Sequence, residues 1–301
     1  MPDKNGYRQY LDPSVVSKLA SLELKAKTVV EGFMVGLHKS PYHGFSVEFS
    51  EHRPYMQGDQ LKDIDWKIYG KSDRYYIKQY EEETNLTAHI FLDISKSMKF
   101  GSEENLSKLE YGKILAASLA YLLIQQQDAV GLGLYSEKIE SFLPPKSTRV
   151  YLQNILKSIH NAEGSSKTNT AASLESMSDK IKRRGMVILI SDFFDDISSI
   201  LNVLKKLYYQ KNDVLVFQIL DPLEESFAFD RNAVFVDMET NEEITTQPYQ
   251  IQRAYKEAFG EYLSRLKKGC LNYGIEYNLL TTSESFETAL LSFIKRRNKH
   301  L

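Results

Sequence analysis

Cysteine is almost absent from this chain of 301 residues, which contains Cys270 and no other. A single cysteine excludes an internal disulfide framework and a cysteine-rich zinc site, and it fits a reducing compartment. The sequence also lacks a run of about 18 consecutive apolar residues, and its polar start, Met1 to Tyr10, lacks the apolar core of a secretory signal. These absences predict a cytoplasmic protein with no integral membrane segment, in which Cys270 is a small buried side chain.

Charge of one sign is not in excess either. The chain has 38 Lys and Arg against 40 Asp and Glu, a formal net charge of -2. Because a global basic field is missing, non-specific binding to nucleic acid is not expected. With 42% hydrophobic and 26% charged residues, the composition is that of a globular protein with one large domain or two small ones.

Familiar catalytic motifs are missing as well. There is no Gly-x-Ser-x-Gly elbow and no His-Glu-x-x-His pair, and the six histidines are scattered. Asp93 could end a strand as a phosphoaspartate nucleophile, but dehalogenase-like phosphatases need a second Asp where Ser95 stands. Gly164 to Thr168 lacks the glycines of a phosphate-binding loop. The sequence therefore predicts a protein that is not an enzyme, with a metal-dependent hydrolase as a less favoured alternative.

From Thr87 onward, short apolar strands alternate with segments of helical spacing. Strands are expected at 87–93, 129–135, 138–143, 186–190, 214–220, 233–238 and 275–280, and helices at 106–127, 148–160, 170–184, 197–209, 251–271 and 285–297. This alternation predicts an α/β fold with a doubly wound, mostly parallel sheet.

The front of the chain lacks that alternation. Helical spacing extends over 12–37, and strand-like alternation occurs at 45–49 and 74–80. We therefore expect two parts: a small N-terminal helix and β subdomain over residues 1–86, and the α/β domain over residues 87–301.

The first predicted strand of the α/β domain ends in Asp93-Ile-Ser95-Lys-Ser97. In open α/β sheets ligands bind at the carboxyl ends of strands, and carboxylate and hydroxyl oxygens suit a hard cation. Taken alone, the motif is equally compatible with a polar turn that has Ser97 near the start of a helix.

Two further polar positions follow the same pattern. Asp192 comes directly after the apolar run 186–190, and Thr168 precedes a predicted helix, where its hydroxyl could cap that helix or face a cation. Two carboxylates with several hydroxyls suit Mg²⁺, with Mn²⁺ or Ca²⁺ as alternatives. Ordinary turn and cap roles for Asp192 and Thr168 are less favoured, because three polar positions coincide at strand ends.

These residues resemble the metal-ion-dependent adhesion site of von Willebrand factor A domains, whose pattern is Asp-x-Ser-x-Ser, then a distant Thr, then a later Asp. The resemblance implies that Asp93 and Asp192 hold the cation largely through water, while a partner's carboxylate completes the shell. It implies direct hydroxyl ligands from Ser95, Ser97 and Thr168.

The match leaves two points open. Thr170, two residues after Thr168, could replace it as the hydroxyl ligand. The sequence Ser191-Asp192-Phe193 departs from the commoner Thr-Asp-Gly of the family, although it retains the carboxylate.

A second resemblance lies in the front third. The segment from Arg53 to Trp66 is similar to a signature of the family called domain of unknown function 58, which reads Arg-x-Tyr-x-x-Gly-Asp-x-x-Arg-x-Ile-Asp-Trp. In that family, the signature precedes a von Willebrand A-like domain. Lys62 replaces the second Arg, so a bidentate guanidinium contact would be lost there. Members are often associated with MoxR-type AAA+ ATPases, which implies that this chain is an adaptor or cofactor of such an ATPase.

The signature segment has two interpretations. Arg53, Asp59 and Asp65 could form a surface that faces a partner. Alternatively, Arg53 pairs with Asp65 and the segment fastens the subdomain to the sheet, which we favour. Overall, the sequence predicts a metal-dependent protein-interaction module that binds an acidic partner residue, with a metal-independent scaffold as the main alternative.

Overall fold

The computed structural model describes residues 7–39, 52–54, 69–70, 75–78, 86–102, 105–163, 170–229, 233–236 and 243–298. Contacts divide the chain into two compact units. The larger unit comprises Met1–Gly36 and Leu86–Leu301, and the smaller unit is Leu37–Asn85.

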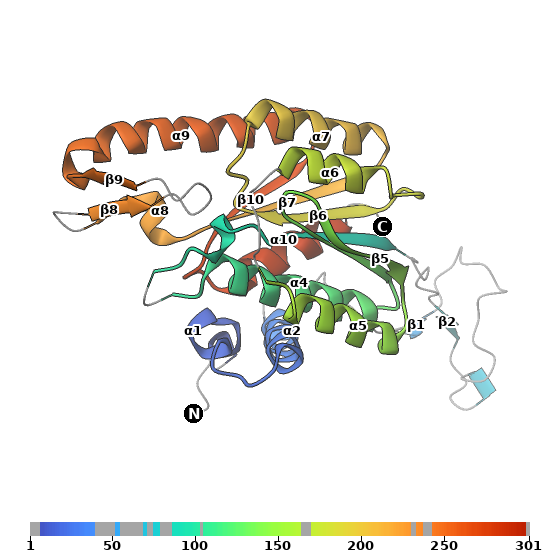
Figure 1. The fold of residues 1–301 in the computed structure, drawn as a ribbon. Helices are drawn as coiled ribbons and strands as arrows, with labels where there is room; N and C mark the ends of the chain where they lie inside the picture. The colour runs from blue at the N-terminus through green and yellow to red at the C-terminus, as the bar shows by residue number, and fades with distance from the viewer. Residues whose placement is uncertain are drawn as a thin grey trace. The chain divides into compact units, whose positions relative to one another are not determined.

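A six-stranded sheet forms the centre of the larger unit (Figure 1). Its strands are β3 (Thr87–Asp93), β4 (Ala129–Tyr135), β5 (Ile139–Lys146), β6 (Met186–Ser191), β7 (Asp213–Leu220) and β10 (Glu276–Thr281). The order is β10-β7-β6-β3-β4-β5, and only the β4–β5 pair is antiparallel. The apolar strands β3, β6 and β7 are almost entirely buried, as strands covered on both faces should be. The predicted doubly wound, mostly parallel fold is confirmed.

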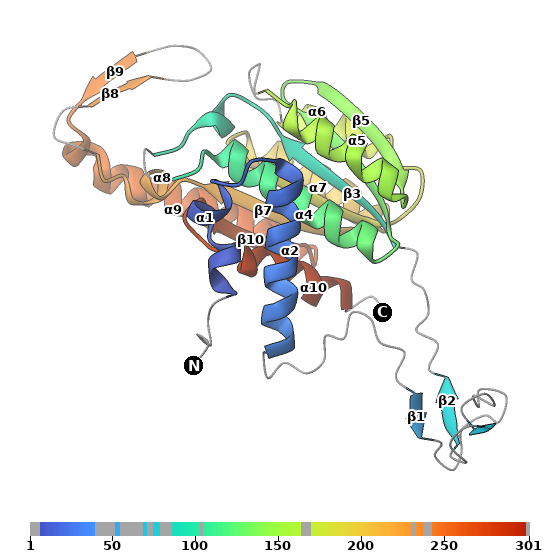
Figure 2. The ribbon, with the colours of Figure 1, turned by 90° about the horizontal axis from the view of Figure 1, so that it is seen from below.

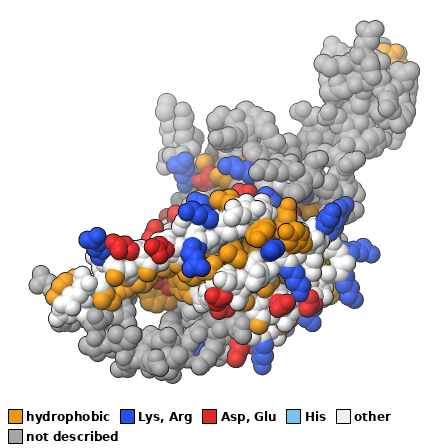
Figure 3. All heavy atoms as spheres, turned by 90° about the horizontal axis from the view of Figure 1, so that it is seen from above, with side chains coloured by type: hydrophobic (Ala, Val, Ile, Leu, Met, Phe, Trp, Pro, Cys, Tyr) orange, Lys and Arg blue, Asp and Glu red, His pale blue; other side chains and the backbone are white. Residues whose placement is uncertain are grey.

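Helices cover both faces of the sheet (Figure 1). One layer contains α4 (Lys108–Gln125), α5 (Arg149–His160) and α10 (Phe286–Asn298), and the other contains α6 (Thr170–Ser178), α7 (Ile197–Tyr209) and α9 (Pro248–Asn272). The outer face of the second layer shows charged and apolar side chains next to one another (Figure 3). Among the described residues, no helix combines the length and apolar character needed to cross a membrane.

The direction of the strand order reverses between β3 and β6. From β3 the chain continues through α4 to β4 on one side, whereas β6, β7 and β10 follow one another on the other side. In open α/β sheets, ligands bind outside the carboxyl ends of the strands at such a reversal. Asp93 ends β3 and Asp192 directly follows β6.

The N-terminal helical segment differs from the prediction. Instead of one helix over 12–37, the chain forms η1 (Arg8–Leu11), α1 (Pro13–Val16) and α2 (Leu22–Lys39). The break has a local cause, because Asp12 caps α1 and the Ser21 hydroxyl accepts a 3.2 Å bond from the Leu24 amide where α2 begins.

The larger unit also contains these N-terminal helices, which the sequence analysis placed with the β subdomain. Helix α2 lies beneath α4 (Figures 1 and 2). It buries Val29, Val30 and Phe33, and Glu23 accepts a 2.9 Å hydrogen bond from Gln153 of α5. Burial of this apolar face is the physical reason for the difference.

The smaller unit contains β1 (His52–Pro54) and β2 (Tyr76–Lys78), which pair antiparallel with Arg53 opposite Ile77. The strand predicted at 74–80 is thus present over its central residues. The strand predicted at 45–49 lies outside the described residues, as do Asp59 and Asp65.

Three further differences concern the α/β unit. Helix α6 ends at Ser178 rather than at residue 184, since the Ser178 hydroxyl bonds to the Glu175 carbonyl and the backbone turns. Strand β8 (Ala233–Val236) pairs with β9 (Glu243–Thr246) and not with the central sheet. Neither β9 nor α8 (Pro222–Ser226) was predicted, although Asp221-Pro-x-Glu224 is a capping-box sequence.

Candidate metal site

Asp93 connects the carboxyl ends of β3 and β6. Its side chain is fully buried. The Oδ1 atom accepts a 2.8 Å hydrogen bond from the Ser95 amide, and Oδ2 accepts a 2.6 Å bond from the Ser191 hydroxyl. The turn after β3 and the end of β6 are therefore held in a fixed relation by one carboxylate.

Ser95 and Ser97 bring their hydroxyls together above this turn. The two Oγ atoms are 3.1 Å apart, and Ser97 starts a short 3-10 helix, η3 (Ser97–Lys99). Neighbouring ligands in an octahedron with metal–oxygen bonds of about 2.1 Å lie about 3.0 Å apart. The serine pair thus has the spacing that two direct ligands of Mg²⁺ require.

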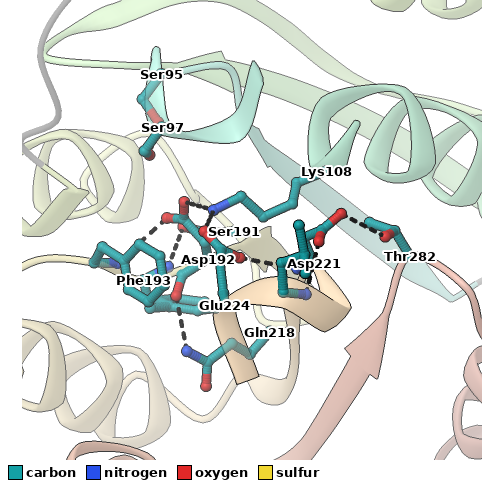
Figure 4. A network of polar contacts seen from close by, with 12 residues as sticks. Ser95, Ser97, Lys108, Ser191, Asp192, Phe193, Gln218, Asp221, Glu224 and Thr282 are labelled. Carbon is teal, nitrogen blue, oxygen red and sulfur yellow. Dashed lines mark hydrogen bonds and ion pairs between the residues drawn. The ribbon is translucent and has the colours of Figure 1, made fainter. Parts of the chain in front are cut away.

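Asp192 is also fully buried, and both of its carboxylate oxygens have partners (Figure 4). Oδ2 accepts a 2.8 Å bond from the ammonium of Lys108, and Oδ1 accepts a 3.3 Å bond from the Phe194 amide. Its backbone carbonyl accepts a 2.8 Å bond from the Gln218 side chain on β7. Asp192 is fixed in place by two elements that are distant in the sequence, α4 and β7, and by the backbone two residues further on.

Phe193 occupies the position at which the pattern Thr-Asp-Gly has glycine. Its φ of 58° lies in the left-handed region, where glycine is favoured and a side chain causes strain. The phenyl ring is fully buried, the amide donates a 2.8 Å bond to the Ser191 hydroxyl, and the carbonyl accepts a bond from Tyr262. Burial of the ring and these bonds hold the strained backbone.

This geometry predicts an unusual order of stabilities for two variants. Phe193→Ala and Phe193→Gly both lose the buried ring, so a comparison between them isolates the backbone. We expect the glycine variant to be the more stable by roughly 0.5–1 kcal/mol, because glycine adopts positive φ without strain. Urea unfolding of the two proteins measures this difference, and a more stable alanine variant would contradict the assignment.

Lys108, with its partner Glu224, is a residue of this site that the sequence analysis missed. Its side chain is fully buried, and its ammonium lies 2.8 Å from Asp192 Oδ2, 2.6 Å from Glu224 Oε1 and 4.6 Å from the centre of the Phe194 ring. Burial lowers the pKa of this lysine, but the two carboxylates more than offset burial, so the pKa is raised and the side chain is charged. One signal was available: Lys108 is the first residue of an apolar helix, where a cation opposes the helix dipole.

The carboxylates of the site influence one another. Burial, together with repulsion from Asp192, raises the pKa of Asp93 to about 7, although hydrogen bonds from Ser191 and Ser95 act in the opposite direction. When all groups are ionised, Asp93, Asp192 and Glu224 carry three negative charges against the one positive charge of Lys108. The cluster then has a surplus of two negative charges, which one divalent cation would neutralise.

The threonine ligand cannot be placed in the same way, because Thr168 lies outside the described residues. Thr170, the first residue of α6, is buried, and its hydroxyl finds no hydrogen-bond partner in the described part of the chain. In that part no group of three or more His, Cys, Asp or Glu side chains is arranged to hold a metal ion. A cation here would therefore depend on hydroxyl ligands. The serine pair and the surplus charge fit a hard divalent cation.

Comparison with known proteins identifies relatives without an assigned activity. The family described as "Protein of unknown function DUF58" matches residues 51–263, which include the Arg53 to Trp66 signature, Asp93 and Asp192. The uncharacterized proteins Mb1516 of Mycobacterium bovis and Rv1480 of Mycobacterium tuberculosis are each 22% identical over 298 residues, covering 96% of this chain and 91% of the relative.

Among solved structures, the conserved hypothetical protein BatB from Bacteroides thetaiotaomicron is similar, with a TM-score of 0.48 and 17% identity over 71% of this chain and 99% of that one. An aerotolerance-related membrane protein from Bacteroides fragilis gives a TM-score of 0.46 and 19% identity with the same coverage. The SpRpn10 VWA domain gives 0.44 and 10% identity, over 69% of this chain and 94% of that one.

Proposed function

This chain belongs to the DUF58 family, and since the family description assigns no activity, we propose from the site itself that it is a metal-dependent protein-interaction module. Ser95 and Ser97 would bind Mg²⁺, or else Mn²⁺ or Ca²⁺, directly, with Asp93 and Asp192 acting largely through water. A bound cation would supply an open coordination position for a carboxylate of a partner protein. The observation that supports the proposal is the meeting of two buried carboxylates and a serine pair at the carboxyl ends of β3 and β6.

Binding is favoured over catalysis by the way the carboxylates are used. Both oxygens of Asp93 and both oxygens of Asp192 already accept bonds from protein groups. These bonds fix the orientation of both carboxylates, while each oxygen retains a second lone pair that can accept from a metal-bound water. The arrangement suits carboxylates that fix the positions of ligands.

The partner would present an acidic residue. From the sequence resemblance, we propose a MoxR-type AAA+ ATPase in the cytoplasm, for which this chain would serve as an adaptor or cofactor. A partner-facing role of Arg53, Asp59 and Asp65 stays a prediction of the sequence.

Removal of the central carboxylate should weaken cation binding. We expect Asp93→Ala to weaken Mg²⁺ binding at least about tenfold, because the site loses one of its charged groups. Titration calorimetry measures the affinity, and Asp179→Ala on the surface is the matched control. Equal affinity of Asp93→Ala and the wild type would refute the metal site.

If the protein is instead a metal-independent scaffold, capture of its partner should not require a cation. Affinity capture from native lysate, with and without EDTA, distinguishes the two. If the module depends on the cation, the chelator and Asp93→Ala should each remove the same captured protein. Capture that persists in EDTA would favour the scaffold.

A further inference from the structure

Burial of the charged Lys108 side chain at a cation site is energetically unfavourable. Its ammonium has no exposed surface and is held between Asp192 and Glu224, both by short ion pairs. Replacing buried ion triads by apolar residues of similar volume is often neutral or stabilising. Stability alone therefore does not explain a buried cation next to a proposed metal ligand.

The second partner of this lysine is itself rigidly placed. Glu224 Oε2 accepts a 2.8 Å bond from the Asp221 amide, and the Asp221 side chain accepts a 2.8 Å bond from the Leu223 amide, which completes a capping box. The Glu224 carbonyl accepts a 2.9 Å bond from Tyr255 on α9. Glu224 cannot follow Lys108 elsewhere without breaking the start of α8, so the ammonium is kept beside Asp192 (Figure 4).

The charge of Lys108 determines the charge of the whole cluster. With it, the ionised cluster has a surplus of two negative charges; without it, the surplus is three. In a buried site of low effective dielectric constant, an uncompensated charge is costly. The total charge of the protein groups therefore selects the charge of the cation that binds best.

We propose that Lys108, held in place by Glu224, makes the site selective for divalent over trivalent cations and limits how tightly a divalent cation binds. This inference rests on the proposed metal site and adds a residue that sets its selectivity. Lys108 acts through Asp192 and is a positioning residue, not a ligand.

Two substitutions should move the affinity for Mg²⁺ in opposite directions. Lys108→Met removes the positive charge and keeps the length of the side chain, so Mg²⁺ should bind at least about tenfold more tightly. The preference of the Lys108→Met variant for Tb³⁺ over Mg²⁺ should also rise at least about tenfold. Glu224→Gln removes a negative charge, so it should weaken Mg²⁺ binding.

Matched controls are available on the same helices. Lys113→Met makes the same change on α4 at a lysine that pairs with Glu110, and Glu225→Gln makes the same change on α8 at an exposed residue. Calorimetry with Mg²⁺ and with Tb³⁺ alone should show both controls close to the wild type. Circular dichroism confirms that each variant is folded, and if Lys108→Met does not fold, Lys108→Gln, which removes the same charge but keeps a donor for Asp192 and Glu224, makes the same test.

The outcomes separate this inference from the proposed function. If wild type binds Mg²⁺ and both variants match it, or if both shift the affinity in one direction, the role of Lys108 is refuted while the metal site stands. If wild type does not bind Mg²⁺, both are refuted. Opposite shifts, with the change in Tb³⁺ preference, support the assignment.

Discussion

Asp93→Asn should stabilise the metal-free protein at pH 8 by on the order of 3–4 kcal/mol. Burial and repulsion from Asp192 raise the pKa of Asp93 to about 7, so its ionised form is unfavourable in the folded state. Asparagine keeps the shape and can still accept the bond from the Ser95 amide. Its amide group can donate to the Ser191 hydroxyl, which donates to Asp93 in the wild type.

The sign of this effect depends on pH. The pKa of Asp93 is raised in the folded state from an ordinary value of 3.8, so the folded state retains the proton longer than the unfolded state does. Below about pH 4 both states are protonated and Asp93→Asn should change little. The advantage of the variant should grow as pH rises from about 4 to 7 and then level off.

Urea unfolding in EDTA at several pH values measures this difference. Addition of Mg²⁺ should stabilise the wild type and reduce the advantage of Asp93→Asn, because the ion neutralises the surplus charge. A difference between the two proteins that is the same at pH 4 and pH 8 would show that ionisation of Asp93 is not its cause.

Such a result would connect stability with function at this site. A buried carboxylate pair without a full complement of positive charge destabilises the free protein, and a cation that binds only the folded state recovers that free energy. Residues that destabilise the fold and are nevertheless present tend to mark functional sites.

The central sheet could be predicted from the sequence because the signals for its strands are local. Strands β3, β6 and β7 are short apolar runs separated by helical spacing, and this periodicity is sufficient to predict a doubly wound sheet. The break between α1 and α2 was missed because Asp12 and Ser21 cap two helices whose apolar positions continue one helical spacing. The β8–β9 pair was missed because β8 has the same apolar character as a central strand.

The candidate site could be predicted in part for the same reason. Asp93 and Asp192 each follow an apolar strand, and adjacent parallel strands bring their carboxyl ends together. Lys108 and Glu224 are joined across 116 residues by a contact that no local pattern encodes. Only the unfavourable position of a lysine at the start of a helix, and the capping box of α8, hinted at them.

The burial of His89 should make the folded protein less stable as the pH becomes acidic. His89 lies within β3, is almost fully buried, and packs near the rings of Phe91 and Phe142. Its Nδ1 atom has no hydrogen-bond partner among the described residues. Burial lowers the pKa of His89 from 6.5 to about 4, so protonation of the folded state is strongly disfavoured.

The pH dependence of His89 is opposite in sign to that of Asp93. Because the folded pKa lies below the unfolded one, the contribution of neutral His89 is fully present above about pH 6.5 and is lost as pH falls toward 4. The loss is on the order of 3 kcal/mol. His89→Leu removes this titration, so its stability relative to wild type should increase as pH falls through that range.

In the metal-free wild type, the two groups act against each other between about pH 4 and pH 6.5. The stability of Asp93→Asn should therefore fall as pH falls from about 6.5 to 4, because His89 still titrates. The stability of His89→Leu should fall as pH rises from about 4 to 7, because Asp93 still titrates. Urea unfolding in EDTA tests this, with His160→Leu at the exposed end of α5 as the control. A His89→Leu profile parallel to that of wild type would mean that the buried imidazole is protonated in the folded state without cost, which its apolar surroundings oppose.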